Sequence, residues 1–213
     1  NVSRIGPLID IRREGSIKMP RYHSLLANLE QTSQKPGGFV VYCSLGTVTS
    51  GFKKKVKRFF MKIKSVAVRN PEILFVLSTG KDFDINQLLP APSNLLVFVS
   101  VPQVDLLQHC HLMVTHGGMN SITECIYNEV PMLVFPLSPH WDQPGNSARV
   151  TFQSLGLQGS ILRDSVKSIS RKINKIRGNY AFYKQNVVKM KVRFEENNSS
   201  TQIVEILQGH FFL

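Results

Sequence analysis

A glycine-rich stretch with polar side chains at regular spacing is the part of this chain best suited to bind a charged ligand. It reads His116-Gly117-Gly118-Met119-Asn120-Ser121. The apolar residues 112–115 before it predict a short buried strand, and apolar residues at helical spacing after it predict a helix. A strand–turn–helix junction directs free backbone N–H groups and the positive end of a helix dipole toward one point, which favours an anion.

The side chains around this turn extend the same chemistry. The two glycines let a phosphate approach the main chain closely, because no Cβ is in the way. His116 can donate to an oxyanion, and Asn120 and Ser121 add donors in the first helical turn. Glu124 lies one turn further along the same face, where it can accept from a sugar hydroxyl. The set suits a diphosphate attached to a ribose. A tight turn with a capped helix is the structural alternative.

Composition and charge limit the classes of protein to consider. The chain has 213 residues, 42% hydrophobic and 19% charged, which predicts a packed core rather than disorder. Lys and Arg exceed Asp and Glu by 26 to 14, and the net charge of +12 favours anionic partners. Cys43, Cys110 and Cys125 lie in apolar or helical stretches without metal-like spacing, so we expect reduced core thiols in a reducing compartment.

Apolar runs such as 39–45 and 95–101 have the length of strands, and none approaches the roughly 20 residues of a membrane span. The sequence shows no initiator Met and no signal-peptide pattern. We therefore predict a cytoplasmic location and expect the chain to be a piece of a longer protein.

The apolar runs are continuous and alternate with helical patterns, which predicts a Rossmann-like α/β domain with a parallel sheet covered by helices on both faces. Residues 1–20 are expected to be a connector with a short extended segment at 4–9, residues 21–178 the Rossmann-like domain, and residues 179–213 a helical C-terminal tail. We expect strands at 39–45, 73–77, 95–99, 112–115 and 130–136. Helices are expected at 22–31, 53–68, 104–108, after 116–121, and at 146–155, 165–176, 180–196 and 201–208.

Four polar turns follow predicted strands, at residues 44–47, 100–103, 116–121 and 138–143. The carboxyl ends of parallel strands share one rim of the sheet, so these turns can converge on a single ligand. In the last turn, Asp142 and Gln143 offer a carboxylate and an amide side by side, which suits the hydroxyls of a pyranose. A helix cap is the alternative role for Asp142.

The order and spacing of these turns resemble the signature of the UDP-glycosyltransferases of the two-Rossmann-domain (GT-B) class. The family pattern is W-x-P-Q, H-x-G-x-x-S-x-x-E, G-V-P and a final D/E-Q pair, preceded by an S-[LF]-G-[ST] turn. This chain carries in the same order Ser44-Leu45-Gly46-Thr47, Ser100-Val101-Pro102-Gln103, residues 116–124, Glu129-Val130-Pro131 and Asp142-Gln143. The resemblance covers residues 39–159 and implies the C-terminal, nucleotide-sugar-binding half of a GT-B fold, with bacterial macrolide- or flavonoid-modifying enzymes as the most similar type.

The resemblance also implies roles for individual residues. The diphosphate would be held by Thr47, His116, Gly118, Asn120 and Ser121. The nucleoside would lie against Ser100, Val101, Gln103 and Glu124, and the transferred sugar against Trp141, Asp142 and Gln143. Ser100 stands where the family commonly has a Trp stacked on uracil, which leaves the base identity open. Trp141 either lines the sugar pocket or packs the loop.

The implied reaction is inverting, metal-independent transfer of a sugar from a UDP-sugar to an acceptor hydroxyl, with no cofactor. The general base would be a His of the N-terminal domain, so no catalytic residue is expected in this chain, and the isolated chain would bind donor yet turn over poorly. The expected partners are a UDP-sugar, a small-molecule acceptor (lipid, polyketide, flavonoid or similar) and the chain's own N-terminal domain, onto which the helices from Tyr180 would pack.

Several other patterns have structural alternatives. Asp82-Phe83-Asp84 matches the D-x-D of metal-dependent glycosyltransferases, but a solvated polar loop is favoured. His109 and His111 flank Cys110 without a fourth metal ligand, so no metal site is predicted. The basic face of residues 53–68 is interpreted as a solvated surface, with peripheral membrane contact as an open alternative and nucleic acid not expected.

Two other functions stay open from the sequence. One is an isomerase of the UDP-N-acetylglucosamine 2-epimerase type, which shares the two-domain fold, although the Pro102-Gln103 and Asp142-Gln143 pairs argue against it. The other is a non-catalytic nucleotide- or polyanion-binding module that depends on the net charge of +12.

Overall fold

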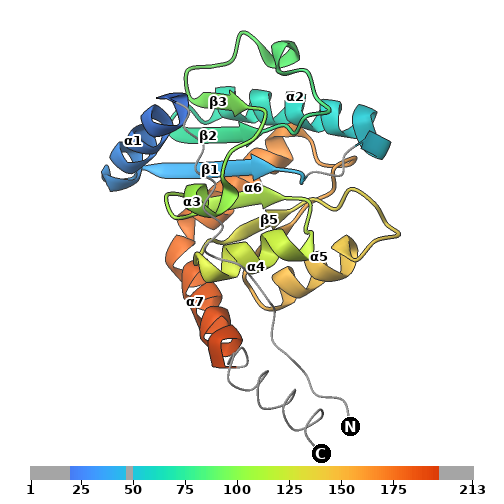
Figure 1. Cartoon of the computed structure of the whole chain (residues 1–213). Coiled ribbons are helices and arrows are strands. Elements are labelled where there is room, and N and C mark those ends of the chain that lie inside the picture. Colours follow the sequence, from blue (N-terminus) through green and yellow to red (C-terminus); the bar gives the residue numbers. More distant parts are fainter. Residues whose placement is uncertain (1–19, 47–49, 197–213) are drawn as a thin grey trace, which may run out of the picture.

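The computed structural model of the chain describes residues 20–46 and 50–196, and it contains a six-stranded, entirely parallel sheet in the order β3-β2-β1-β4-β5-β6 (Figure 1). The strands are β1 (Phe39–Ser44), β2 (Ile73–Ser78), β3 (Leu95–Phe98), β4 (Leu112–Thr115), β5 (Met132–Val134) and β6 (Gly156–Gln158). The predicted parallel sheet is confirmed. Its strand order reverses between β1 and β4, and open α/β sheets bind ligands outside the carboxyl ends of the strands at such a point.

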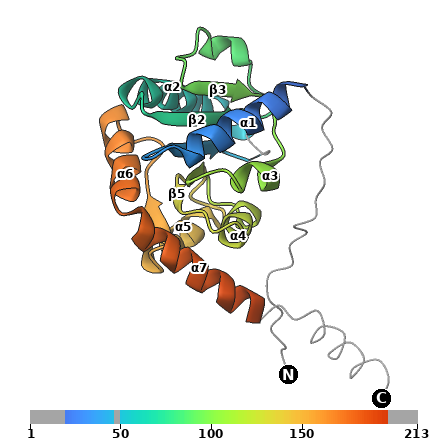
Figure 2. The ribbon, with the colours of Figure 1, turned by 90° about the vertical axis from the view of Figure 1, so that its left-hand side faces the viewer.

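Helices cover both faces of this sheet. They are α1 (Pro20–Gln34), α2 (Lys53–Arg69), α3 (Gln103–Leu107), α4 (Met119–Tyr127), α5 (Gln143–Phe152), α6 (Val166–Gly178) and α7 (Tyr180–Glu196), with short 3₁₀ helices η1 (Ser50–Phe52) and η2 (Ile85–Leu88). Figure 2 shows α2 and α6 on one side of the sheet and α1, α3 and α4 on the other. Helix α7 crosses between the layers, because Tyr183 joins the core on the α2–α6 side and Val187 the core on the opposite side.

The central strands are apolar on both sides because both of their faces are covered. Every residue of β1, β2 and β4 is buried. Successive side chains of a strand point to opposite faces. In β1, Val41 and Cys43 therefore join the core beneath α2 and α6, whereas Val40 and Tyr42 join the core beneath α1, α3 and α4. The three cysteines are free and buried, and burial raises the pKa of each thiol.

Helix α2 is stabilised by the packing of its buried side chains rather than by capping interactions at its ends. Its buried residues recur at helical spacing, at Val56, Phe59, Phe60, Ile63, Val66 and Ala67. Its first turn carries three lysines and no acidic residue, which opposes the helix dipole. The Lys62 ammonium donates to the carbonyls of Ile161 and Asp164 at 3.2 and 2.8 Å, which ties α2 to the segment before α6.

Helix α7 packs on α4 and α6 of the same domain, and its side chains pair with the loop before β5. Lys184 and Lys191 lie 3.7 and 3.0 Å from the Glu129 carboxylate, and the hydrogen bond from Lys191 is the main cause that lowers the pKa of Glu129. Glu129 has a φ of 59°, in the left-handed region, at the position where the family pattern G-V-P has glycine. The expected docking of the C-terminal tail on another domain stays a prediction, because residues 197–213 lie outside the described part of the chain.

The structure differs from the expected elements at several points. Helix α1 is longer than the expected 22–31, strand β5 is shorter than the expected 130–136, and the helix η2 was not expected. Strand β6 was not predicted, and α5 begins at Gln143 rather than at residue 146. Pro144 lies in the first turn of α5, where its missing N–H costs no helical hydrogen bond. The expected connector and extended segment within residues 1–19 and the expected helix at 201–208 lie outside the described residues. In residues 20–46 and 50–196, no helix has the length and apolar character needed to cross a bilayer.

Candidate functional site

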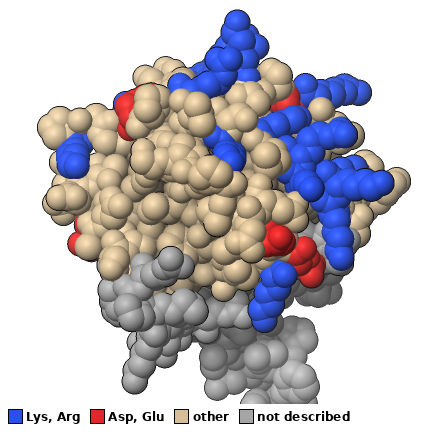
Figure 3. All heavy atoms as spheres, turned by 90° about the horizontal axis from the view of Figure 1, so that it is seen from above, with Lys and Arg blue, Asp and Glu red and all other residues tan. Residues whose placement is uncertain are grey.

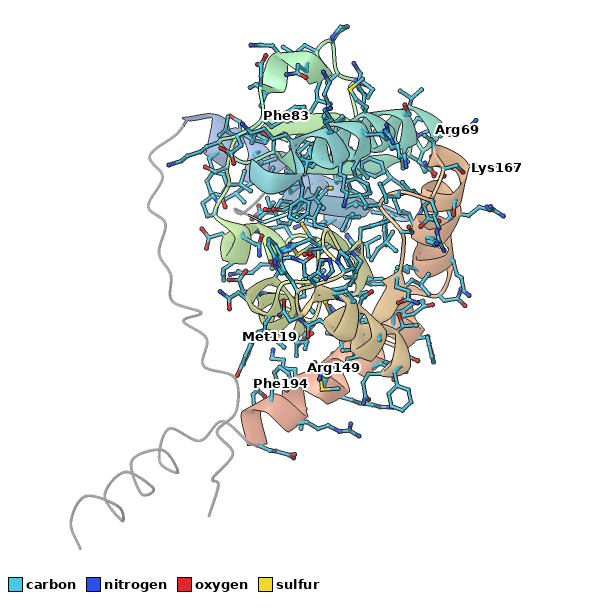
Figure 4. All side chains as sticks on the ribbon, turned by 90° about the vertical axis from the view of Figure 1, so that its right-hand side faces the viewer. Arg69, Phe83, Met119, Arg149, Lys167 and Phe194 are labelled. Carbon is cyan, nitrogen blue, oxygen red and sulfur yellow. The ribbon has the colours of Figure 1, made fainter. Side chains whose placement is uncertain are left out.

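A cleft of about 760 Å³ opens at the carboxyl ends of β1, β2 and β4, at the reversal of the strand order. Figure 4 views the molecule from this edge of the sheet, with Phe83 above and Met119, the first residue of α4, below. The cleft is lined by all the described residues that the sequence predicted for the site: Ser100, Val101, Gln103, His116, Gly118, Asn120, Ser121, Glu124, Trp141, Asp142 and Gln143. The remaining predicted residue, Thr47, lies outside the described residues.

His116 follows β4, and its ring lies between two glycines. A Cβ on Gly46 or on Gly118 would stand 2.6 Å from a ring atom, so larger residues at either position would displace the imidazole. Gly46 and Gly117 have φ values of 80° and 86°, which favour glycine on conformational grounds as well. The loops after β1 and β4 are thereby shaped to hold one side chain in a fixed position.

The electrostatic setting of His116 keeps its ring neutral near pH 7. Burial lowers the pKa of His116 below its usual value of 6.5, although the negative charge of Asp142 acts in the opposite direction. The Nδ1 atom is buried and lacks a hydrogen-bond partner within the described part of the protein. Because His116 lines the cleft, its ring can gain a hydrogen bond or a proton when an anion enters.

Helix α4 begins beside this ring with an uncapped N-terminus. Its N-cap residue is Gly118, which provides no side-chain hydrogen bond to the first turn. The first N–H groups of a helix have no partner within the helix itself. Asn120 and Ser121 lie in this turn and line the cleft. Backbone and side-chain donors of α4 therefore face the same space as His116, an arrangement suited to phosphate oxygens.

A hydrogen-bonded network joins α3 to α4 next to this anion site. The Gln103 amide nitrogen donates to a Glu124 carboxylate oxygen at 2.5 Å and to the Ser121 hydroxyl at 3.2 Å. The Tyr42 hydroxyl, from β1, donates to the Gln103 amide oxygen at 3.3 Å. Tyr42 lines the cleft but was missed from the sequence, because it lies inside an apolar strand and its only signal is a hydroxyl among aliphatic neighbours.

The loop between β5 and α5 forms the opposite wall. The Gln143 amide oxygen accepts from the backbone N–H groups of Leu137 and Ser138 at 2.8 and 3.4 Å, which closes this loop. The Asp142 carboxylate accepts from the Asn146 amide at 2.8 Å and makes no capping hydrogen bond. Asp142 thus occupies the N-cap position of α5 as the alternative expected, but without a capping hydrogen bond from its side chain, and it lines the cleft.

Trp141 and Ser100, the two residues where this chain departs from the family pattern, lie in different surroundings. Trp141 is 43% exposed, lines the cleft and also packs edge-on against Phe52, with ring centroids 5.4 Å apart. Its packing role is thus present, and its contact with a sugar stays a prediction. Around Ser100 the cleft wall consists of Val99, Ser100 and Val101. The described cleft residues thus place no aromatic side chain at the position of the family's Trp.

The other polar motifs have structural roles. The Asp84 carboxylate accepts from the Asn86 N–H at 3.0 Å at the start of η2, and Phe83 packs edge-on against Phe60. His111 accepts from the Val40 N–H through Nδ1 at 3.1 Å, and the Cys110 thiol donates to the Leu106 carbonyl. In the described ranges, no group of three His, Cys, Asp or Glu residues is placed to hold a metal ion.

Comparison with known proteins gives consistent results. Among curated proteins, the UDP-glucosyltransferase YdhE of Bacillus subtilis is 31% identical over 140 residues, which cover 62% of this chain and 33% of that protein. UDP-glucuronosyltransferase 3A2 of Mus musculus is 32% identical over 145 residues, which cover 65% of this chain and 26% of that protein. This chain therefore spans about a third or less of these relatives.

Solved structures share the fold. The glycosyltransferase of kitacinnamycin superposes with a TM-score of 0.77 at 22% identity, over 97% of this chain and 48% of that chain. Os79 of O. sativa, solved with UDP and deoxynivalenol-3-glucoside, superposes with a TM-score of 0.67 at 20% identity, over 90% of this chain and 45% of that chain. The model of the UDP-glucoronosyl and UDP-glucosyl transferase family matches residues 8–196, so this chain belongs to that family and has the fold of one half of a GT-B glycosyltransferase.

Proposed function

We propose that this chain is the donor-binding half of an inverting UDP-glycosyltransferase. The observation that carries the proposal is that four turns, separated by up to about a hundred residues of sequence, line one cleft at the reversal of the strand order. In the proposed complex the diphosphate lies on the start of α4 beside His116. The nucleoside lies along Val101, Gln103 and Glu124, and the sugar extends toward Trp141 and Asp142.

The chemistry assigned to the cleft is stabilisation of the leaving nucleotide. When the bond between the sugar and the β-phosphate breaks, negative charge develops on the diphosphate. The N-terminus of α4 and the His116 ring are already oriented toward that charge, and such preorganised donors are among the largest contributions to catalysis. The proposal assigns no step to a metal ion. The acceptor hydroxyl and the general base that deprotonates it would come from a second domain.

The choice of ligand follows from the relatives. Os79 was solved with UDP, and the curated relatives are named as UDP-glucosyltransferases and UDP-glucuronosyltransferases, so we propose a UDP-sugar as donor. Structural neighbours named for kitacinnamycin and calicheamicin support a small-molecule acceptor. These same relatives favour a transferase over the epimerase and the non-catalytic module. Cytoplasmic location stays a prediction.

We also propose a peripheral membrane contact for the exposed face of α2, on one specific observation. Its exposed residues combine the cations Lys53, Lys54, Lys57, Arg58 and Arg69 with Met61 and Val68, which are 39% and 62% exposed. Figure 3, which views the molecule from above, shows Lys and Arg gathered along one side with few acidic residues among them. Cations interleaved with apolar side chains suit an anionic lipid surface better than nucleic acid.

The proposed donor site is tested by titration calorimetry of the chain with UDP and with UDP-glucose. His116→Ala should weaken both ligands about tenfold or more, because a hydrogen bond to a charged group contributes about 1.5–3 kcal/mol. Asp142→Ala should weaken UDP-glucose and leave UDP unchanged, since Asp142 is assigned to the sugar. His109→Ala and Asp82→Ala, which alter residues of the same types that do not line the cleft, are the matched controls.

Two results would contradict the assignment. If the wild-type chain bound neither ligand, or if His116→Ala bound UDP as tightly as wild type, the diphosphate site would be wrong. Equal losses for UDP and UDP-glucose in Asp142→Ala would remove the sugar assignment.

A further inference from the structure

Tyr42 places a buried hydroxyl on the floor of the cleft, beside the buried hydroxyls of Ser44 and Ser78. Its side chain is 1% exposed, belongs to the apolar core beneath α1, α3 and α4, and still lines the cleft. Burial is the main cause that raises the pKa of Tyr42, so the hydroxyl keeps its proton at all physiological pH values. A protonated hydroxyl held in a packed layer is a hydrogen-bond donor of fixed position.

The acceptor of this hydroxyl is the amide oxygen of Gln103, at 3.3 Å. The oxygen and nitrogen of a carboxamide lie on opposite sides of the group, so fixing the oxygen also fixes the nitrogen. That nitrogen donates to Glu124 and Ser121. With the amide reversed, its oxygen would face the Glu124 carboxylate and both groups would be acceptors. Tyr42 therefore selects the amide orientation that supports the carboxylate.

We propose that Tyr42 is a positioning residue that orients Gln103, and through it Glu124, for the hydroxyls of the donor's ribose. The inference rests on the proposed function, in which Glu124 accepts from the ribose. Gln103 engages one carboxylate oxygen of Glu124, so the other is the oxygen assigned to the ribose hydroxyl. Tyr42 touches neither the reacting atoms nor the assigned ribose position, and it acts only through Gln103.

Tyr22 provides a matched control in the same layer. It is also buried, at 7% exposed, and belongs to the same apolar core as Tyr42. Its hydroxyl has no hydrogen-bond partner among the described residues. Replacing either tyrosine by phenylalanine removes one oxygen and keeps the ring, so the two variants differ only in what the lost hydroxyl was bound to.

The test is calorimetry of the chain with UDP and with 2′,3′-dideoxy-UDP. Tyr42→Phe should weaken UDP binding about threefold to tenfold, the usual effect of one hydrogen bond, and leave 2′,3′-dideoxy-UDP binding unchanged. The preference of the site for UDP over 2′,3′-dideoxy-UDP should therefore fall by the same factor. Tyr22→Phe should change neither ligand. Thermal unfolding of both variants checks that the fold is kept.

A double-mutant cycle separates this role from a general structural one. In a Gln103→Leu background, Tyr42→Phe should have no further effect on UDP binding, because its route to the ribose is gone. An unchanged nucleotide preference in Tyr42→Phe, equal losses for both nucleotides, or a full additional effect in Gln103→Leu would overturn this inference alone. Absence of UDP binding in the wild-type chain would contradict the proposed function and this inference together.

Discussion

At the scale of single residues, His116 connects the conformation of the loops to the chemistry of the cleft. Its ring lies between Gly46 and Gly118, and its buried Nδ1 has no partner in the described part of the chain. A buried polar atom without a partner costs free energy, which most proteins avoid. Here the same atom and the lowered pKa make the ring responsive to an anion.

This setting predicts a pH dependence of donor binding. The pKa of free His116 is lowered by burial, so the ring is neutral at pH 7.5. A bound diphosphate favours the charged ring and raises that pKa, so binding should strengthen as pH falls from about 7.5 to 5.5, by about tenfold for each unit by which the pKa rises. UDP-glucose is the ligand to use, because both of its phosphates are esterified and keep their charge over this range.

Calorimetry of UDP-glucose at several pH values checks this expectation, with His116→Gln as the comparison. The variant should show a nearly flat profile. A flat profile in the wild-type chain, or the same slope in both proteins, would show that another group carries the titration.

At the scale of elements, Glu129 combines a strained backbone conformation with ion pairs to a neighbouring helix. Its φ of 59° favours glycine, while Lys184 and Lys191 of α7 pair with its carboxylate. Exposed ion pairs contribute about 0–1 kcal/mol, and relieving a left-handed conformation gives a similar amount. The ion pairs from α7 therefore contribute about as much to the stability of the fold as the strained backbone of the loop before β5 costs.

Two substitutions separate these contributions. Glu129→Ala and Glu129→Gly both remove the ion pairs, but only glycine relieves the backbone. We expect the glycine variant to be more stable than the alanine variant by about 1 kcal/mol in urea-induced unfolding. Equal stabilities would mean that the left-handed conformation at this position carries little strain.

Much of this organisation could be predicted from sequence, and what was missed has physical reasons. Long apolar runs and helical spacing located the central strands, and the glycines around His116 located the cleft. Strand β6 was missed because three residues containing Gly156 and Gln158 carry no β pattern. The start of α5 was placed too late because Pro144 and Gly145 resemble a break, although proline fits a first helical turn. Tyr42 was missed because sequence alone does not show which buried strand residue reaches the cleft.

At the scale of the whole molecule, the positive charge is concentrated rather than spread evenly. The net charge is +12, and no ion pair involves a Lys or Arg of α2 among the described residues. The lysines at the start of α2 also oppose its dipole. Asp82 and Asp84 line a small pocket with Lys53 and Lys57, but no ion pair joins them among the described residues. An anionic surface outside the molecule would add compensating charge.

The membrane proposal predicts binding to vesicles that contain phosphatidylserine, and none to vesicles of phosphatidylcholine alone. Changing Lys54, Lys57 and Arg58 to Glu should weaken binding about a hundredfold or more, at about 1 kcal/mol for each lost basic residue. The control carries the same charge change on separate elements, as Lys81, Lys175 and Lys189 to Glu, and should bind nearly as well as wild type. Vesicle sedimentation measures the binding of the wild-type chain, the α2 variant and the control variant. Equal losses in the two variants, or tighter binding to nucleic acid than to vesicles, would contradict a dedicated face on α2.

One side chain gives the cleft a further property. The Asn146 amide donates both to the carbonyl of Gly117, at 3.0 Å, and to the carboxylate of Asp142, at 2.8 Å. It therefore spans the boundary between the wall assigned to phosphate and the wall assigned to sugar. In the proposed complex one amide would therefore support both ends of a single nucleotide sugar, the phosphates through the glycine turn and the sugar through the carboxylate. A change at Asn146 would then disturb the two walls together rather than one of them.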